Sequence, residues 1–262
     1  MKNIKYDKYQ RNHVIVKGRE KALEKFVNST TIINGKRVKH KSKNSCSSNS
    51  EDALTWSCFD TLRSYKSKNL VDALNEILED SFYGTKPFDF SLEKNITVEI
   101  GKEYIAPTLK TNKNKNEKTE VDASIETEDK LIFIEAKLYS LISLPTALQP
   151  HNQIANKLRI GLDYSRNNKK EFYFIFLDIA PLEKLTIRKP KTEAVQSSHE
   201  FSSKWKSAWW FSYYKNQRSL KPLKDVLVDI SIKDDEIIQL QQRMGWLTWA
   251  SLFKIVLRAT IK

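Results

Sequence analysis

Cysteines and long apolar runs are scarce in this sequence. Its 262 residues include two cysteines, Cys46 and Cys58, which do not have metal-ligand spacing and are too few for a disulfide framework. The first five residues lack the apolar core of a secretion signal, and no apolar run is long enough to span a bilayer. These absences predict a protein of the reducing cytoplasm with no membrane partner.

Acidic residues are fewer than basic ones. The chain has 45 lysines and arginines against 32 aspartates and glutamates, which gives a net charge of +13 and a pI near 9.5. A charge of this size favours a polyanionic partner such as nucleic acid. Glycine and alanine are also scarce while lysine, asparagine and isoleucine are abundant, so biased composition is a second explanation of the charge. Hydrophobic residues make up 40%, which is enough for a substantial core.

Residues 121–126 and 131–138 are typical of two strands joined by a short polar turn. The second strand is almost entirely apolar but carries Glu135 and Lys137, which share a face because they are two residues apart. A lone carboxylate is costly to bury, so a metal ion or a reacting group would explain it. In an antiparallel hairpin, Asp122 on the first strand would lie beside Glu135.

The elements around this hairpin predict an α/β (α+β) fold with a mixed central sheet flanked by helices. A helix within residues 145–164 separates strand 131–138 from the apolar strand 172–177, and a strand-helix-strand unit implies parallel pairing. Further expected elements are helices at 19–27, 51–65 and 70–78, a hairpin at 31–38 and a strand at 96–100. The helix at residue 51 begins either with a capping box from Ser48 or with Ser50 as its cap.

We expect three parts in the chain. Residues 1–50 form a basic N-terminal arm or small subdomain, residues 51–180 form the core, and residues 181–262 form an aromatic-rich extension packed on that core. The extension is expected to hold a strand at 185–188 and helices over 234–261, divided at Gly245.

Two segments have more than one interpretation. The basic loop at 110–118 either grips a phosphate backbone or is a solvated insertion. The segment 204–215 mixes tryptophan, tyrosine and lysine, so it either stacks on nucleobases or packs into the core.

Phosphodiester hydrolysis needs an activated water and neutralisation of phosphate charge. Clustered carboxylates that hold divalent ions supply both, and ligand sets made only of oxygen suit magnesium or manganese. A lysine beside the metal orients the water or stabilises negative charge. Asp122, Glu135 and Lys137 are the residue types that a metal-dependent phosphodiesterase requires.

Asp122 followed by Glu135-Ala136-Lys137 at the end of an apolar strand resembles the PD-(D/E)xK nuclease superfamily, which includes many restriction endonucleases. The resemblance covers roughly residues 51–177 and implies a restriction endonuclease-like core. Some members carry an added acidic residue on the first core helix, a position that Glu51 matches. Others carry a glutamine on the helix after the lysine strand, where Gln153 is the best match.

Two positions depart from the family pattern. Val121 replaces the proline that precedes the aspartate, and Lys157 stands where the related glutamine pattern has a tyrosine.

The resemblance implies a role for each matched residue. Asp122 and Glu135 would ligate Mg²⁺, with Mn²⁺ able to substitute, and the Ala136 carbonyl would be a further ligand. Glu51 would complete or support the metal site, whereas the residues alone favour a role in capping the helix and interacting with its positive end.

Lys137 would position the attacking water, and Gln153 would orient Lys137 or contact the phosphate. The expected protein is a Mg²⁺-dependent endonuclease, a deoxyribonuclease of the restriction, phage-defence or transposition type. Its expected partner is nucleic acid, with DNA favoured, and double-strand cleavage would need a homodimer, a larger nuclease complex or two successive nicks.

Two other functions also fit the sequence. One is a non-catalytic nucleic-acid-binding protein with a decayed nuclease fold, against which the complete set of Asp122, Glu135 and Lys137 argues. The other is a protein-interaction module whose charge reflects composition. A steep loss of DNA affinity with added salt would indicate phosphate contacts.

Overall fold

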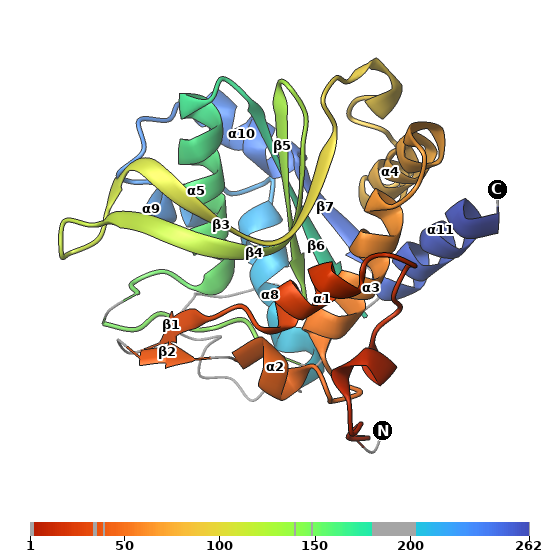
Figure 1. Cartoon of the computed structure of the whole chain (residues 1–262). Coiled ribbons are helices and arrows are strands. Elements are labelled where there is room, and N and C mark those ends of the chain that lie inside the picture. Colours follow the sequence, from red (N-terminus) through yellow and green to blue (C-terminus); the bar gives the residue numbers. More distant parts are fainter. Residues whose placement is uncertain are drawn as a thin grey trace.

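A mixed β-sheet lies at the centre of the computed structural model, which describes residues 3–33, 36–38, 40–138, 140–147, 149–179 and 203–261 (Figure 1). Within these residues the sheet has five strands in the order β3-β4-β5-β6-β7. Their bounds are β3 (Thr97–Lys110), β4 (Asn116–Glu126), β5 (Lys130–Ala136), β6 (Glu171–Asp178) and β7 (Met244–Thr248). The β3-β4 and β4-β5 pairs are antiparallel, whereas β5-β6 and β6-β7 are parallel. The predicted mixed α/β class is confirmed.

Helices cover both faces of the sheet. One apolar cluster joins the sheet to α3 (Glu51–Arg63), α4 (Ser67–Ser81) and α11 (Trp249–Ile261). A second joins the other face to α5 (Gln153–Asn167), α8 (Ser203–Lys215), α9 (Lys221–Val226) and α10 (Asp234–Gln242). None of the helices in the described ranges is long and apolar enough to cross a lipid bilayer.

The N-terminal part packs against the side of α3. It contains η1 (Tyr9–Asn12), α1 (Glu20–Val27), the β1 (Thr31–Ile33) and β2 (Lys36–Val38) hairpin, and α2 (His40–Asn44). Leu23, Phe26 and Val27 of α1 form a small buried cluster with Trp56 of α3. The predicted helix and hairpin of this part are confirmed, and the turn residues 34–35 lie outside the described residues.

Strand β5 is buried on both faces because helices cover each side of it. Leu131 and Phe133 belong to the cluster on the α5 side, whereas Ile132 and Ile134 belong to the cluster on the α3 side. Side chains alternate along a strand, so Glu135 is directed to the α5 side. This alternation brings the carboxylate of Glu135 towards the first turns of α5.

Helix α3 begins at Glu51, as expected. Ser50 is its cap, because the Ser50 hydroxyl accepts a hydrogen bond from the Ala53 amide at 3.2 Å. Of the two predicted caps, Ser50 is therefore confirmed and the capping box from Ser48 is wrong. The side chain of Glu51 remains available for contacts outside the helix.

The predicted basic loop at 110–118 is wrong in extent. Strand β3 continues to Lys110 and β4 begins at Asn116, so the turn covers residues 111–115 alone. Pairing of Tyr104 with Thr119 extends the hairpin, and Tyr104 and Leu109 are buried against the α5 side of the sheet. The strand register shifts between Ile105 and Lys110, which lets Tyr104 and Leu109, five residues apart, both face the α5 side.

The helices predicted over 234–261, divided at Gly245, are present, but a strand that was not predicted lies between them. Residues 244–248 form β7, which pairs in parallel with β6 and separates α10 from α11. Trp246 and Leu247 are buried on opposite faces of the sheet. Gly245 permits close packing, since a Cβ there would lie 2.9 Å from Cζ of Phe82.

The aromatic segment packs into the core where its side chains are described. Trp209, Trp210, Phe211 and Tyr214 of α8 are buried in the cluster on the α5 side, which agrees with the packing interpretation. The side chains of Lys204, Trp205 and Lys206, and the predicted strand at 185–188, lie outside the described residues.

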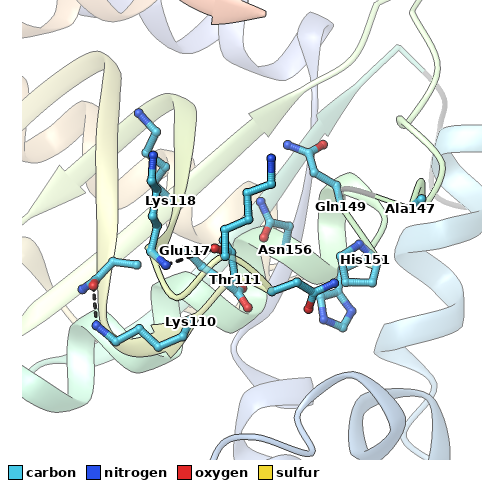
Figure 2. A pocket seen from close by; sticks show the side chains of 13 residues that line it. Lys110, Thr111, Glu117, Lys118, Ala147, Gln149, His151 and Asn156 are labelled. Atoms are coloured by element: carbon cyan, nitrogen blue, oxygen red, sulfur yellow. Dashed lines mark hydrogen bonds between the residues drawn. The ribbon is translucent and has the colours of Figure 1, made fainter. Parts of the chain in front are cut away.

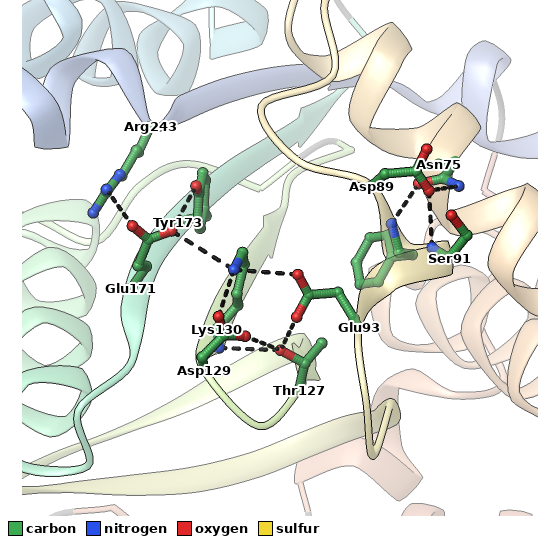
Figure 3. A network of polar contacts seen from close by, with 11 residues as sticks. Asn75, Asp89, Ser91, Glu93, Thr127, Asp129, Lys130, Glu171, Tyr173 and Arg243 are labelled. Carbon is green, nitrogen blue, oxygen red and sulfur yellow. Dashed lines mark hydrogen bonds and ion pairs between the residues drawn. The ribbon is translucent and has the colours of Figure 1, made fainter.

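A charge network fixes the start of β5 (Figure 3). Lys130 lies 3.2 Å from Glu93, 2.8 Å from Asp129 and 3.8 Å from Glu171. Glu171, at the start of β6, also accepts from Arg243 at 2.8 Å, just before β7. These contacts tie three parallel strands together at the end of the sheet opposite to Glu135.

Gly161 allows α5 to approach the sheet closely. A Cβ at this position would lie 2.2 Å from Phe172 and 2.9 Å from Phe133. Both rings are buried and packed edge to face, so they have little room to move. We predict that Gly161→Ala destabilises the protein by about 1–3 kcal/mol through overpacking, despite the better helix propensity of alanine. Urea unfolding measures this, and an unchanged or higher stability would contradict it.

Candidate functional site

A cleft of about 580 Å³ opens at the C-terminal end of β5. Elements from separate parts of the chain line it: the segment after α2, the start of α3, β4, the end of β5 and the first turns of α5. Glu51, Asp122, Ala136, Lys137 and Gln153 all line this cleft. The fold therefore gathers the residues that the sequence singled out at one place.

Asp122 lies beside Glu135 as the hairpin predicts. The pairing of Ala123 with Ile134 sets this register, and Oδ2 of Asp122 accepts a hydrogen bond from the Ala136 amide at 2.8 Å. Burial acts to raise the pKa of Asp122, but Lys137, Lys157 and the Ala136 amide outweigh it and hold the pKa below its usual value. Asp122 is thus kept as a carboxylate.

Glu135 is fully buried between two lysines. Its Oε1 lies 2.8 Å from Nζ of Lys137, and its Oε2 lies 2.8 Å from Nζ of Lys157. These are ion-pair distances, yet neither carboxylate oxygen has an aligned hydrogen-bond partner among the described residues. Burial and the charge of Asp122 raise the pKa of Glu135 to about 7, although both lysines act in the opposite direction.

Lys137 remains charged in this setting. Burial acts to lower its pKa, but Glu135, Asp122 and Glu51 together raise the pKa above its usual value. The backbone of Lys137 is fixed on both sides, since its amide donates to Leu177 at 2.7 Å and its carbonyl accepts from Trp249 at 3.1 Å. The residue can therefore supply a fixed positive charge, whereas a role as a neutral base is disfavoured.

Glu51 reaches from α3 to the end of β5. Its Oε2 accepts a hydrogen bond from the Leu138 amide at 2.7 Å, while Ser50 provides the helix cap. Burial raises the pKa of Glu51, and the nearby Lys137 partly offsets this effect. The side chain thus belongs to the cleft and does not serve as the cap.

Gln153 lines the cleft but is held against the preceding loop. Its side-chain Oε1 accepts from the Ser143 backbone amide at 3.3 Å, and the Gln153 backbone amide donates to the Ser143 carbonyl at 3.1 Å. No hydrogen bond joins Gln153 to Lys137 in the described part of the chain. The predicted orientation of Lys137 by Gln153 therefore has no contact to support it here.

Lys157 is the site residue that sequence reasoning missed. It lies one turn after Gln153 on α5, is almost fully buried, and contacts both Glu135 and the Glu120 carbonyl, the latter at 2.5 Å. Its signal was the polar stripe of Gln149, Gln153 and Lys157 at four-residue spacing. Lys157 also occupies the position where the resembled pattern has a tyrosine.

The N-terminal part forms one side of the cleft. Nζ of Lys41 lies 2.5 Å from Oε1 of Glu120 and is buried over the ring of Phe26. Asn44, Ser47 and Asn49 line the same cleft. The first fifty residues therefore contribute directly to the shape of the site.

The donor atoms suit a hard divalent cation, although the described residues contain no preformed cluster of three or more His, Cys, Asp or Glu side chains that could hold a metal. Each oxygen of the buried Glu135 has an ion-pair contact with a lysine but no aligned hydrogen bond among the described residues, and the neighbouring acids Asp122 and Glu51 offer oxygen alone. Magnesium and manganese prefer such ligands. Ala136 lines the cleft, so its carbonyl stays a predicted ligand.

Comparisons with protein-family models, curated proteins and solved structures found no match.

The pairing of Glu135 with Lys157 gives a test by double-mutant cycle. We predict that Lys157→Met costs about 3 kcal/mol of folding stability, because a buried carboxylate loses one of its two counter-charges. Glu135→Gln together with Lys157→Met should cost less than the two separate changes combined, with a coupling of about 1–3 kcal/mol.

Chemical denaturation followed by circular dichroism measures both quantities. The exposed Lys68→Met is the control and should change stability by less than about 0.5 kcal/mol. Additive effects of the two substitutions would show that the charges do not interact.

Proposed function

We propose that this chain is a Mg²⁺-dependent endonuclease that hydrolyses phosphodiester bonds, with DNA as its substrate. One observation carries the proposal: Asp122 and Glu135 meet at the end of β5, with the ammonium group of Lys137 at 2.8 Å from Glu135. Asp122 and Lys137 line the cleft, and Glu135 is buried directly behind them. This combination of adjacent carboxylates and a fixed lysine suits phosphate chemistry. The PD-(D/E)xK assignment rests on the same residues and on the order of strands and helices.

In this proposal Asp122 and Glu135, with Glu51 and the Ala136 carbonyl, would hold Mg²⁺, and Mn²⁺ would be able to substitute. When bound, the ion supplies an activated water and neutralises phosphate charge. Lys137 holds the attacking water and stabilises the negative charge that develops on the phosphate. Gln153, at the edge of the cleft, contacts the phosphate.

Lys157 is a positioning residue, since it touches Glu135 from α5. Its ammonium group sets the direction of one Glu135 oxygen and leaves Lys137 to set the other.

The charge and the thiols support the biological setting that we propose. The net charge of +13 favours a polyanion, and Cys46 and Cys58 are free thiols, as a reducing cytoplasm would keep them. One site per chain cuts one strand at a time, so double-strand cleavage would require a homodimer, a larger nuclease complex or two successive nicks. Restriction, phage defence and transposition are the processes that use such an enzyme.

A non-catalytic nucleic-acid-binding protein is the second candidate. The observation that favours it is the pairing of Glu135 with two lysines, which already balances the charge that a metal would otherwise neutralise. DNA binding without cleavage at any divalent cation concentration would select this candidate.

Asp122→Asn tests the proposed chemistry. We predict that it reduces cleavage of supercoiled plasmid by at least about a hundredfold, because one charged ligand of the metal is lost. Asp235→Asn makes the same chemical change on the exposed start of α10 and should leave cleavage unaltered. Circular dichroism must show that both variants are folded. Full cleavage by folded Asp122→Asn would refute the proposed mechanism.

Metal removal gives a separate test. We expect EDTA to stop cleavage, and added Mg²⁺ or Mn²⁺ to restore it. Ca²⁺ or Mg²⁺ at a hundred times its Kd should also stabilise the folded protein by about 2.7 kcal/mol through mass action. Asp122→Asn should lose this shift, which thermal unfolding detects without any activity. Cation-independent cleavage, or an equal shift in the variant, would contradict a metal site at Asp122.

A further inference from the structure

A second cavity, of about 350 Å³, lies beneath the tip of the β3-β4 hairpin (Figure 2). Its walls carry lysines and side-chain amides: Lys110, Lys113 and Lys115 come from the hairpin, and Gln149 and Asn156 come from the loop before α5 and from α5 itself. We call residues 110–118 the basic hairpin tip. Figure 1 shows this hairpin extending past α5, away from the body of the sheet.

In the described part of the chain, three of the four lysines of the basic hairpin tip have no local counter-charge, whereas Lys118 lies 2.8 Å from Glu103. Lys110, Lys113 and Lys115 are exposed, and no ion pair to a carboxylate engages them among the described residues. Glu117, the acidic residue of the tip, is engaged by the buried Arg159 at 3.1 Å. The tip therefore presents lysines whose charges are open to an external anion.

The turn has a defined shape. The Thr111 amide donates to the Lys115 carbonyl at 2.7 Å, and the Asn114 amide donates to the Thr111 carbonyl at 2.8 Å. Asn114 adopts a left-handed backbone conformation with φ of 56°, which asparagine tolerates better than most residues. The lysines are thus carried by an ordered hairpin, so less entropy is lost when they bind.

Strand β4 connects this tip to the candidate active site. It starts at Asn116 and passes through Asp122 without interruption. Six residues of extended strand span roughly 20 Å. Duplex DNA rises about 3.4 Å for each base pair, so this distance corresponds to about six base pairs.

From this arrangement we propose that the basic hairpin tip binds the phosphate backbone of duplex DNA about six base pairs from the bond cut at Asp122 and Glu135. The assignment rests on the proposed function and extends it to the substrate. Lysines neutralise phosphates, and the amides of Gln149 and Asn156 are suited to phosphate or sugar oxygens. A membrane surface is disfavoured, because Ala147 and Pro150 supply the apolar part of the lining and neither is a large side chain for insertion.

Binding is tested with the full chain in EDTA, so that no cleavage occurs. A fluorescein-labelled duplex of about 30 base pairs is titrated from roughly 50 to 200 mM salt. Lys113→Gln with Lys115→Gln should weaken binding and reduce the slope of log K against log salt by about 2, since two phosphate contacts are lost.

Lys66→Gln with Lys68→Gln removes the same charge from exposed lysines at the start of α4, on the far face of the sheet, and should leave the slope unchanged. An unchanged slope in the hairpin variant, or an equal loss in the control, would overturn the proposal. If the hairpin variant bound single-stranded DNA or RNA more weakly than wild type but bound duplex DNA equally well, the assignment to duplex DNA would be overturned.

The position of the contact is tested by mapping cuts on an end-labelled duplex with Mg²⁺. Wild type should leave roughly six terminal base pairs uncut at one end, and the hairpin variant should cut closer to that end. Equal cutting up to the ends by both proteins would overturn the proposed contact and leave the nuclease function standing. If wild type did not cleave DNA but the hairpin variant still showed the predicted reduction in the salt slope, the nuclease function would be refuted. The hairpin would then remain a phosphate-binding surface.

Discussion

The structure of the site depends on how the buried charge of Glu135 is compensated. A carboxylate with no exposed surface is unfavourable unless counter-charges lie close to it, and here they come from Lys137 on the same strand and Lys157 on α5. The second contact requires α5 to lie close to the sheet, which Gly161 permits at the ring of Phe172. The charge of Glu135 is therefore compensated only when apolar packing holds α5 close to the sheet.

Local sequence patterns predict the part of this arrangement that lies within one hairpin. Alternation along β5 puts Glu135 and Lys137 on one face, and antiparallel pairing brings Asp122 beside them. Lys157 could not be predicted in the same way, because its contact with Glu135 depends on the rotation of α5 about its axis and on its distance from the sheet. Those quantities are set by tertiary packing.

The C-terminal strand β7 was not predicted for a related reason. The stretch around Trp246 also fits helical spacing, and only its pairing with β6, some 70 residues earlier, selects a strand.

The N-terminal part shows the limits of composition as a guide. Its residues are polar and basic, which is typical of an appended arm, yet Phe26 packs on Trp56 and Lys41 pairs with Glu120 at the cleft. A few apolar residues and the ion pair of Arg19 with the buried Asp60 hold this part on α3, and the buried ammonium of Lys41 links it to β4. The cleft is consequently built from segments that are distant in the sequence, and small shifts of the N-terminal part would change its width.

Charge is distributed differently at the cleft and over the whole molecule. Four carboxylates, Glu51, Asp52, Glu120 and Asp122, line the cleft. Glu135 is buried behind its wall, and the ammonium groups of Lys41, Lys137 and Lys157 pair with these acids, although the chain as a whole carries +13. An approaching phosphate would be attracted by the molecule from a distance and repelled by these acids at close range. Under the proposed function a divalent cation removes this conflict, since it binds the acids and the phosphate together. Without a cation the same cleft would hold a phosphate backbone poorly. Strong binding of DNA in EDTA must therefore come from lysines outside the cleft, and the basic hairpin tip is the surface best placed to provide them.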